Sequence, residues 1–440
     1  MDAALERSHQ LKQALLDFVL EAEGDLAAAL EAYAAKQAQR DKGDKAQQDI
    51  IVDSFLSEGQ IGDKTPIDLF IEHHPELSQS DRQLVKSWRR SFMGLFAITQ
   101  ILPDGFELMN WLTAKHYIVK PDNAQFAEEI RRYKEGEILL TRISPVKDAC
   151  WTFSGPCTPL GRLGKPKLAV AIGNFKDNYK KHLYSDAPDL LAEAWESVAR
   201  YHQQFIDFFG SDEVSMPGYQ LNKKIAEFQE VLMQQRLAAA GIDESKTLAE
   251  VAQEAGIDQE ELEAAAAEAG VDGKVAQLFE NKTTAKMVMP KVDLPAELKK
   301  AEQVTALSHP RWGQMFLPTY HRVVALLEAD DWQTIEGAEK LIRNYLEDPK
   351  INAFVWQRLA QKYPTQLEQV LQSVLQRPFQ IDRDLESLLE EFDKLLVPDL
   401  PEIASVPVHL HNLFEEAVAE VNKSKSKKTK KKPALGFQKS

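Results

Sequence analysis

Residues 94–112 read GLFAITQILPDGFELMNWL, two apolar runs rich in β-formers that are joined by Pro103-Asp104-Gly105. A turn of this composition between two such runs favours a β-hairpin. Three further short runs of the same character follow at residues 116–120, 136–143 and 149–153. Five short strands within so short a stretch predict a small, strongly bent antiparallel sheet or barrel, of SH3 or OB size.

The sequence on both sides of this module has helical periodicity instead. On the N-terminal side, Leu11, Leu15 and Val19 recur at four-residue spacing, and Thr65-Pro66 and Ser80 are candidate helix starts. On the C-terminal side, helical patterns return near Asp189 and continue toward the C-terminus. The fold class predicted is therefore a mostly α, helical multidomain protein with a small inserted antiparallel β-barrel-like module and a disordered basic tail.

These patterns divide the 440 residues into six regions, in keeping with the usual size of a domain. They are a helical region at 1–90, the β module at 91–165, a helical region at 166–280, a linker at 281–295, a helical domain at 296–421 and the tail at 422–440. The third region contains the cassette Ala-Gly-Ile/Val-Asp three times, beginning at Ala240, Ala255 and Ala269. Glycine ends a helix and aspartate begins the next in each cassette, so chained short helices are expected.

The charge of the chain is unevenly distributed. The formal net charge is −15, yet residues 421–440 hold eight lysines and no acid. The tail therefore attracts anionic surfaces that the acidic body repels. The candidate partner-binding residues in the tail are Lys423, Lys425, Lys427, Lys428, Lys430, Lys431, Lys432 and Phe437. In the β module, Lys115, Tyr117 and Lys120 place an aromatic ring beside basic groups, as in single-strand readers.

Known catalytic and cofactor motifs are not matched. Gly161-Arg162-Leu163-Gly164-Lys165-Pro166 resembles a P-loop, but Pro166 stands where the hydroxyl is required. A helix-turn-helix-like stretch at 247–262 lies in a strongly acidic region, because residues 243–270 hold nine acids and one lysine, which excludes sequence-specific DNA reading. His409 and His411 could share a metal only if the chain were extended there. No catalytic, cofactor-binding or metal-ligating residue is predicted.

Two cysteines, Cys150 and Cys157, and no apolar run of about 20 residues predict a chain of a reducing compartment without a transmembrane segment. The segment 94–159, with Trp151-Thr152-Phe153-Ser154-Gly155-Pro156 near its end, and the lysine-rich tail finishing in Gly436-Phe437 resemble uncharacterised conserved proteins of cyanobacteria and plastids. The resemblance implies a soluble or thylakoid-peripheral accessory factor. The expected location is cytoplasmic, with a peripheral position on an anionic membrane such as the thylakoid as the alternative that the resemblance leaves open.

Three classes of function remain open. The leading hypothesis is a non-catalytic interaction, assembly or regulatory factor, related to photosynthesis and peripheral to the thylakoid, that binds a protein partner through the β module and acidic helices, with the tail as an electrostatic tether. The tail itself could bind either an anionic membrane surface or RNA. The second is an RNA- or ribosome-associated protein that uses the β module and the tail. The third is an enzyme of unrecognised type, whose site would need converging titratable groups.

Overall fold

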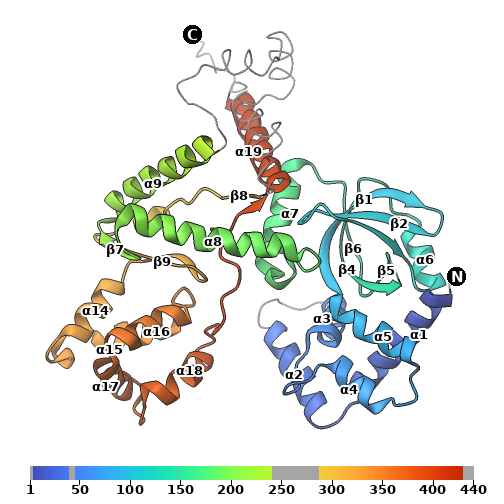
Figure 1. Cartoon of the computed structure of the whole chain (residues 1–440), viewed down its shortest axis with the longest axis horizontal. Helices are drawn as coiled ribbons and strands as arrows, with labels where there is room; N and C mark the ends of the chain where they lie inside the picture. Colours follow the sequence, from blue (N-terminus) through green and yellow to red (C-terminus); the bar gives the residue numbers. More distant parts are fainter. Residues whose placement is uncertain (1–2, 39–44, 148, 240–286, 430–440) are drawn as a thin grey trace, which may run out of the picture. The chain divides into compact units, whose positions relative to one another are not determined.

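The structure is a computed structural model that describes residues 3–38, 45–147, 149–239 and 287–429 (Figure 1). The chain divides into two compact units. Unit 1 comprises residues 1–191 and 407–440, and unit 2 comprises residues 192–406. The described part of the chain is mostly helical and contains one small barrel in its N-terminal half, so the predicted fold class is confirmed.

The barrel of unit 1 closes through five strands at the places that the sequence predicts. They are β1 (Phe92–Leu102), β2 (Gly105–Asn110), β3 (His116–Lys120), β4 (Ile138–Lys147) and β5 (Cys150–Phe153). The strands pair in the order β1-β2-β3-β5-β4, and β4 pairs back onto β1 (Figure 1). A sixth strand, β6 (Thr158–Gly161), lies on the outer edge of β4.

The barrel is mixed and not antiparallel as predicted, because β3 and β5 run parallel. The other pairings in the ring are antiparallel. A closed ring of five strands cannot alternate direction all the way round, so one neighbouring pair has to be parallel. The short helix α6 (Ala124–Ile130) connects β3 to β4 and is capped by the Asn123 side chain. This strand order and helix position are those of the OB-fold, a five-stranded Greek-key barrel.

Aromatic side chains fill the inside of the barrel. The ring centroids of Tyr117 and Trp151 lie 5.3 Å apart, and those of Phe92 and Trp151 lie 5.8 Å apart, both edge to face. Such pairs add attraction beyond the area they bury. The barrel interior is therefore a packed core and not a channel.

The N-terminal helices of unit 1 form a second layer against the barrel. They are α1 (Ala3–Leu20), α2 (Asp25–Ala38), α3 (Lys45–Glu58), α4 (Pro66–His73), α5 (Gln79–Ser87) and the 3-10 turn η1 (Trp88–Arg90). Thr65 forms a capping box at the start of α4, as its sequence predicts. The cap of α5 is Ser78 and not Ser80, because the Ser78 hydroxyl accepts from the backbone N–H of Asp81.

Three more elements complete unit 1. They are α7 (Lys165–Asn178), the 3-10 turn η2 (Lys180–His182) and α19 (Val408–Thr429). Helix α19 packs along α7. It continues past Val421, where the predicted tail begins, so the helical backbone includes the first part of that tail.

Unit 2 contains a sheet that the sequence does not predict. Its strands are β7 (Glu213–Met216), β9 (Val304–His309) and β10 (Gly313–Leu317), which pair antiparallel in the order β10-β9-β7. The helices α8 (Pro188–Phe209) and α9 (Gly218–Ala239) agree closely with the predicted ones. β7 and β9 are far apart in the sequence, so no hairpin turn motif predicts that they pair.

Six α-helices and one 3-10 turn make up most of the remainder of the described part of unit 2. They are α13 (Ala296–Lys299), α14 (Tyr320–Glu328), η3 (Trp332–Thr334), α15 (Ala338–Glu347), α16 (Ala353–Lys362), α17 (Pro364–Leu375) and α18 (Ile381–Glu391). Their core surrounds the fully buried Trp356. The strands β8 (Met287–Val288) and β11 (Val406–Pro407) have two residues each. The Ala-Gly-Ile/Val-Asp cassettes lie outside the described residues.

Candidate functional site

The densest group of buried charges in unit 1 surrounds Arg142 on the outer side of β4. Its side chain is 1% exposed. Arginine remains protonated in proteins, so a guanidinium withdrawn from water needs acceptors and counter-charges on all sides. Register places Arg142 opposite Met93 of β1, on the barrel wall that the helical layer covers.

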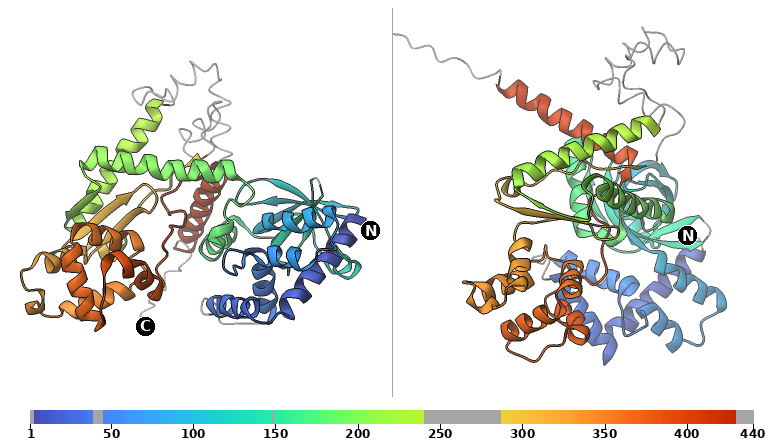
Figure 2. Two further views of the ribbon diagram at one scale, coloured as in Figure 1. Left: turned by 60° about the horizontal axis from the view of Figure 1, so that its bottom comes forward. Right: turned by 60° about the vertical axis from the view of Figure 1, so that its left-hand side comes forward.

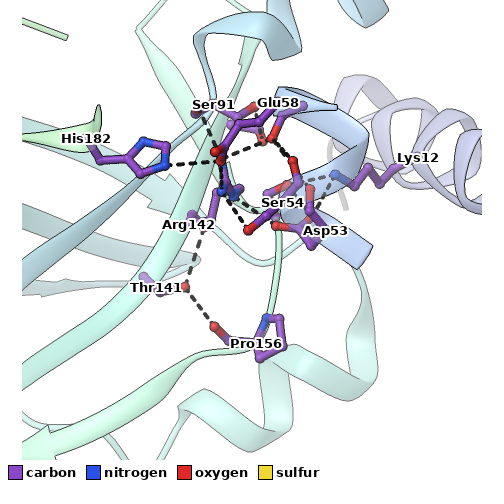
Figure 3. A network of polar contacts seen from close by, with 12 residues as sticks. Lys12, Asp53, Ser54, Glu58, Ser91, Thr141, Arg142, Pro156 and His182 are labelled. Atoms are coloured by element: carbon purple, nitrogen blue, oxygen red, sulfur yellow. Dashed lines mark hydrogen bonds and ion pairs between the residues drawn. The ribbon is translucent and has the colours of Figure 1, made fainter. Parts of the chain in front are cut away.

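Helix α3 supplies these acceptors (Figure 3). The carboxylates of Asp53 and Glu58 pair with the guanidinium, with Nε of Arg142 3.0 Å from Oδ2 of Asp53. The hydroxyls of Ser57 and Ser54 each accept a hydrogen bond of 3.0 Å from the same group. All four acceptors lie within two turns of one helix, so a single guanidinium fastens α3 to the barrel.

The network extends to α1 and to the loop after β5. Lys12 donates to Oδ1 of Asp53 at 2.8 Å and to Oγ of Ser154 at 3.0 Å. Ser154 in turn donates to Oδ1 of Asp53 at 3.3 Å. Gly155 is needed here, because a Cβ at this position would lie 2.8 Å from Oδ2 of Asp53. The loop after β5 therefore passes directly over the buried carboxylate.

His182, in η2, is a further polar partner of Glu58. Its Nε2 lies 3.1 Å from Oε1 of Glu58. Burial by itself would raise the pKa of Glu58, but the contacts with His182 and Arg142 outweigh it and lower the pKa to about 2. Glu58 is therefore a carboxylate at neutral pH.

The polar groups of this network are hydrogen-bonded or ion-paired to one another. Serine catalysis requires a base that can take the hydroxyl proton. Lys12 is ion-paired with Asp53, and Asp53 is ion-paired with both Arg142 and Lys12, so the acceptor that lies next to the Ser154 hydroxyl is already engaged by two cations. The geometry instead joins α1, α3, β4 and η2 into one body, which is a structural role.

Unit 2 contains a comparable network around Arg358 of α16. The guanidinium binds Asp212 through two hydrogen bonds of 2.7 and 2.8 Å and lies 3.0 Å from Glu213. Lys362 is 2.7 Å from the same Glu213 carboxylate. The hydrogen bonds from Arg358 lower the pKa of Asp212. The network ties α16 to the beginning of β7.

Two histidines lie at the same end of the sheet in unit 2. His202 is 3.1 Å from the Ser308 hydroxyl, and Nδ1 of His309 accepts from the backbone N–H groups of Arg311 and Trp312. Burial lowers the pKa of His309 to about 4, with His202 and Arg358 adding to the effect. Among the described residues, no group of three or more His, Cys, Asp or Glu side chains is arranged to hold a metal ion.

The barrel residues singled out from the sequence are engaged within unit 1. Tyr117 is buried in the barrel core, and its hydroxyl donates to Asp186 at 3.1 Å. Lys115 donates to the backbone carbonyl of the same Asp186. Lys120 pairs with Asp104 at 2.6 Å. The structure therefore brings Lys115 and Tyr117 together around Asp186, and the ring of Tyr117 is not presented to solvent.

The tail candidates fall into two groups. Lys423, Lys425, Lys427 and Lys428 belong to the helical backbone of α19. Lys430, Lys431, Lys432 and Phe437 lie outside the described residues. None of the helices in the described ranges has both the length and the apolar character needed to cross a bilayer.

The other sequence candidates have ordinary structural contacts. His409 lies 2.7 Å from the backbone oxygen of Trp111, and His411 lies 3.2 Å from Glu415 one turn later in α19. The P-loop-like stretch forms the end of β6 and the beginning of α7. Cys150 and Cys157 are not joined by a disulfide, and burial raises the pKa of Cys157 to about 11.

Sequence reasoning missed the Arg142 network. The available signal was a single arginine within the apolar run at 138–143, since a charge in a buried strand demands a partner. The partner could not be named, because Asp53 and Glu58 are more than 80 residues away in sequence and lie on a helix with many polar positions.

Comparison with known proteins adds one match. Residues 5–158 match the model of a family of unknown function (DUF7986). No curated protein and no solved structure matches the chain. The matched segment begins in α1 and ends at the start of β6, so it contains both the helical layer and the barrel, with Lys12, Asp53, Glu58 and Arg142 among its residues.

Proposed function

We propose that the chain is a non-catalytic interaction or assembly factor that binds a protein partner through the outer face of the barrel. The observation that carries the proposal is the contrast between the two sides of the barrel. The β4 side is closed by the Arg142 network, whereas the outer side of β2 and β3 remains partly exposed.

The outer face of β2 and β3 combines apolar side chains with polar groups that already contact one another. Register aligns Glu107 with Ile118, and Met109 with His116, across the two strands. Glu107 lies 3.5 Å from His116. The Glu107 carboxylate also accepts a hydrogen bond of 2.8 Å from the Thr99 hydroxyl, so a partner that covers this face meets a carboxylate that already has hydrogen-bonding neighbours.

The tip of the β1–β2 hairpin adds an apolar group next to this face: Ile101 pairs with Phe106, so its side chain lies on the opposite side of the strand pair from Glu107. Ile101 is 48% exposed near the hairpin tip, and Pro103 and Asp104 beside it are also exposed. An aliphatic side chain held at the tip of a rigid hairpin is suited to insertion into an apolar pocket of a partner. The lysine-rich end of the chain acts as an electrostatic tether. The cytoplasmic location, partly on an anionic membrane such as the thylakoid, belongs to the same proposal.

The test is affinity purification of the full-length protein from an extract of its source, followed by mass spectrometry. Ile101→Asp is compared with Leu20→Asp, a matched change at an exposed leucine 56% accessible at the end of α1. We expect a partner that wild type and the Leu20 variant retain and that the Ile101 variant loses. If all three chains recover the same proteins in the same amounts, the hairpin end of the barrel is not part of the binding surface.

A second candidate function is RNA binding, and the OB strand order is the observation that favours it, since such barrels bind oligonucleotides on the β2–β3 face. The test is titration of single-stranded RNA with the full-length chain and with a chain lacking residues 422–440. Binding that depends on both the barrel face and the tail supports it. Equal and negligible binding by both chains rules it out.

A further inference from the structure

Helix α9 packs within unit 2 through one of its sides. The buried residues Leu221, Ile225 and Phe228 follow helical spacing on that side. The ring of Phe228 lies 5.3 Å from that of Tyr201 and 5.9 Å from that of Phe205, both on α8. Figure 2 shows α9 at the periphery of unit 2. The opposite side of the helix therefore faces away from the core of this unit.

Five exposed residues form a ridge along this opposite side. The α9 ridge consists of Tyr219, Lys223, Ala226, Glu230 and Met233. Steps of three and four residues place them on one side of the helix. Tyr219 is 66% exposed and Met233 is 56% exposed. Because tyrosine and methionine are enriched in protein–protein interfaces, the two ends of the ridge are suited to contact with another protein surface.

The two charges of the α9 ridge are only weakly engaged within the chain. Lys223 is 81% exposed and lies 4.0 Å from Glu227, whose carboxylate is closer, at 2.8 Å, to Lys224. Glu230 has no ion pair among the residues that the structure describes. Both charges are therefore available to a partner.

The order of residues along the α9 ridge is self-complementary. Tyr219 and Met233 lie seven residues before and after Ala226, and Lys223 and Glu230 lie three before and four after it. When a second copy of the helix runs in the opposite direction, with the two alanines at the crossing point, Lys223 lies beside the partner's Glu230. Tyr219 then lies beside the partner's Met233. A parallel arrangement would place like charges together, so the sequence favours the antiparallel one.

We propose that the α9 ridge binds the α9 ridge of a second copy of this chain, in an antiparallel dimer with two-fold symmetry. Such an interface uses the same patch on both copies, and the small alanine at its centre allows the helices to approach closely. A polyanion such as RNA fits the ridge less well, because the charge of Glu230 cancels that of Lys223.

The length of the ridge determines the expected strength of the dimer. From Tyr219 to Met233 the helix rises about 21 Å, so the contact is at the small end of specific interfaces. We therefore expect a weak dimer whose population depends on protein concentration. The surface belongs to unit 2 and is independent of the barrel face proposed above.

The experiment is sedimentation velocity of the full-length protein at about 1–100 µM, the range in which weak specific complexes form. Lys223→Glu and Glu230→Lys each create two like-charge contacts in the homodimer, so each should weaken dimerisation about tenfold or more. The matched control is Arg200→Glu in α8, which also places a like charge beside a glutamate one turn away, Glu196. The control should dimerise as wild type does.

A mixture of the two charge variants separates loss of pairing from loss of folding. In the mixed dimer each glutamate of one chain meets a lysine of the other, so an equimolar mixture should recover the dimer that neither variant forms alone. A chain with both changes should also dimerise as wild type does. Changing Tyr219 and Met233 together to serine removes the apolar contacts and should weaken the dimer about tenfold.

Three results would overturn the proposal. They are a wild-type chain that stays monomeric over the whole range, charge variants that dimerise as wild type does, and a mixture that does not recover the dimer. The first result would leave the α9 ridge to a different partner or to solvent. Ile101→Asp should leave dimerisation unchanged, so a failure here is distinguishable from a failure of the barrel proposal.

Discussion

The two units each fasten a helix to a sheet with one arginine, but they place it at different depths. Arg142 is 1% exposed and its acceptors come mainly from α3, whereas Arg358 is 14% exposed and binds two acids that are partly open to water. Because Arg358 and Asp212 are more open to water than Arg142 and Asp53, the same chemistry should contribute differently to the stability of the two units. We therefore expect the burial of each arginine, and not the number of its hydrogen bonds, to determine how much it contributes to the free energy of unfolding.

The largest predicted difference between the networks concerns removal of each arginine. Arg142→Ala leaves the buried Asp53 and the partly buried Glu58 with one strong partner fewer, so unit 1 should lose about 3–5 kcal/mol of unfolding free energy. Arg358→Ala should destabilise unit 2 by only about 1–2 kcal/mol. Hydrogen exchange of the full-length variants measures each unit separately through the amides of α3 and α16. Equal losses in the two units would contradict the comparison.

Acid should act on unit 1 through Glu58. Its pKa is lowered from 4.5 to about 2 in the folded state, so the unfolded chain binds more protons between these values. The stabilisation is complete above pH 4.5 and is lost as the pH falls toward 2, about 3 kcal/mol in all. Urea titrations across this range should show a weaker pH dependence for Glu58→Gln. An identical slope for wild type and variant would mean that other groups control the transition.

A methyl group at Gly155 tests the tight packing over Asp53. The added Cβ would lie 2.8 Å from Oδ2 of Asp53, so Gly155→Ala should destabilise unit 1 by about 1–3 kcal/mol. Gly173 in α7 is the matched control, because a Cβ there meets nothing within 4 Å. Gly173→Ala should be neutral or slightly stabilising. Thermal unfolding of both variants provides the measurement, and the same sign for both would contradict the geometry.

The smallest predicted effect concerns His309 in unit 2. Its folded pKa of about 4 lies below the ordinary value of 6.5, so the unfolded chain binds more protons between them. Unit 2 should therefore lose stability as the pH falls from 6.5 to 4, a window above that of Glu58. His309→Asn retains an acceptor for the Arg311 and Trp312 amides and removes the titration. Its stability should be flatter over this range, as followed by exchange in β9.

The fold was predictable from sequence where its signals are local. The hairpin turn Pro103-Asp104-Gly105 and the β-rich runs around it predicted the barrel, and Thr65-Pro66 predicted the start of α4. The parallel pairing of β3 with β5 results from closure of the five-stranded ring. Closure depends on contacts between distant strands, so no local sequence pattern predicts it. The sheet of unit 2 was missed because β7 pairs with a strand about ninety residues later.

The candidate sites were less predictable than the fold. Tyr117 looked like a ligand-binding aromatic beside two lysines, yet its alternation with Ile118 places it inside the barrel. Arg142 stood in a strand that otherwise reads as core, and its partners come from a distant helix. Charge pairs of this kind depend on tertiary position, so single-sequence patterns show that a partner is needed without showing which one.

The central claim is that unit 1 acts through its surface and that its buried charges serve only to hold it together. The most direct test is partner capture by a variant with Arg142→Met, Asp53→Asn and Glu58→Gln, a neutral replacement of similar volume that can leave a fold intact, after circular dichroism has verified folding. The account predicts that this variant recovers the same partner as wild type and that Ile101→Asp does not. Loss of the partner by the folded network variant, with retention by the Ile101 variant, would contradict it.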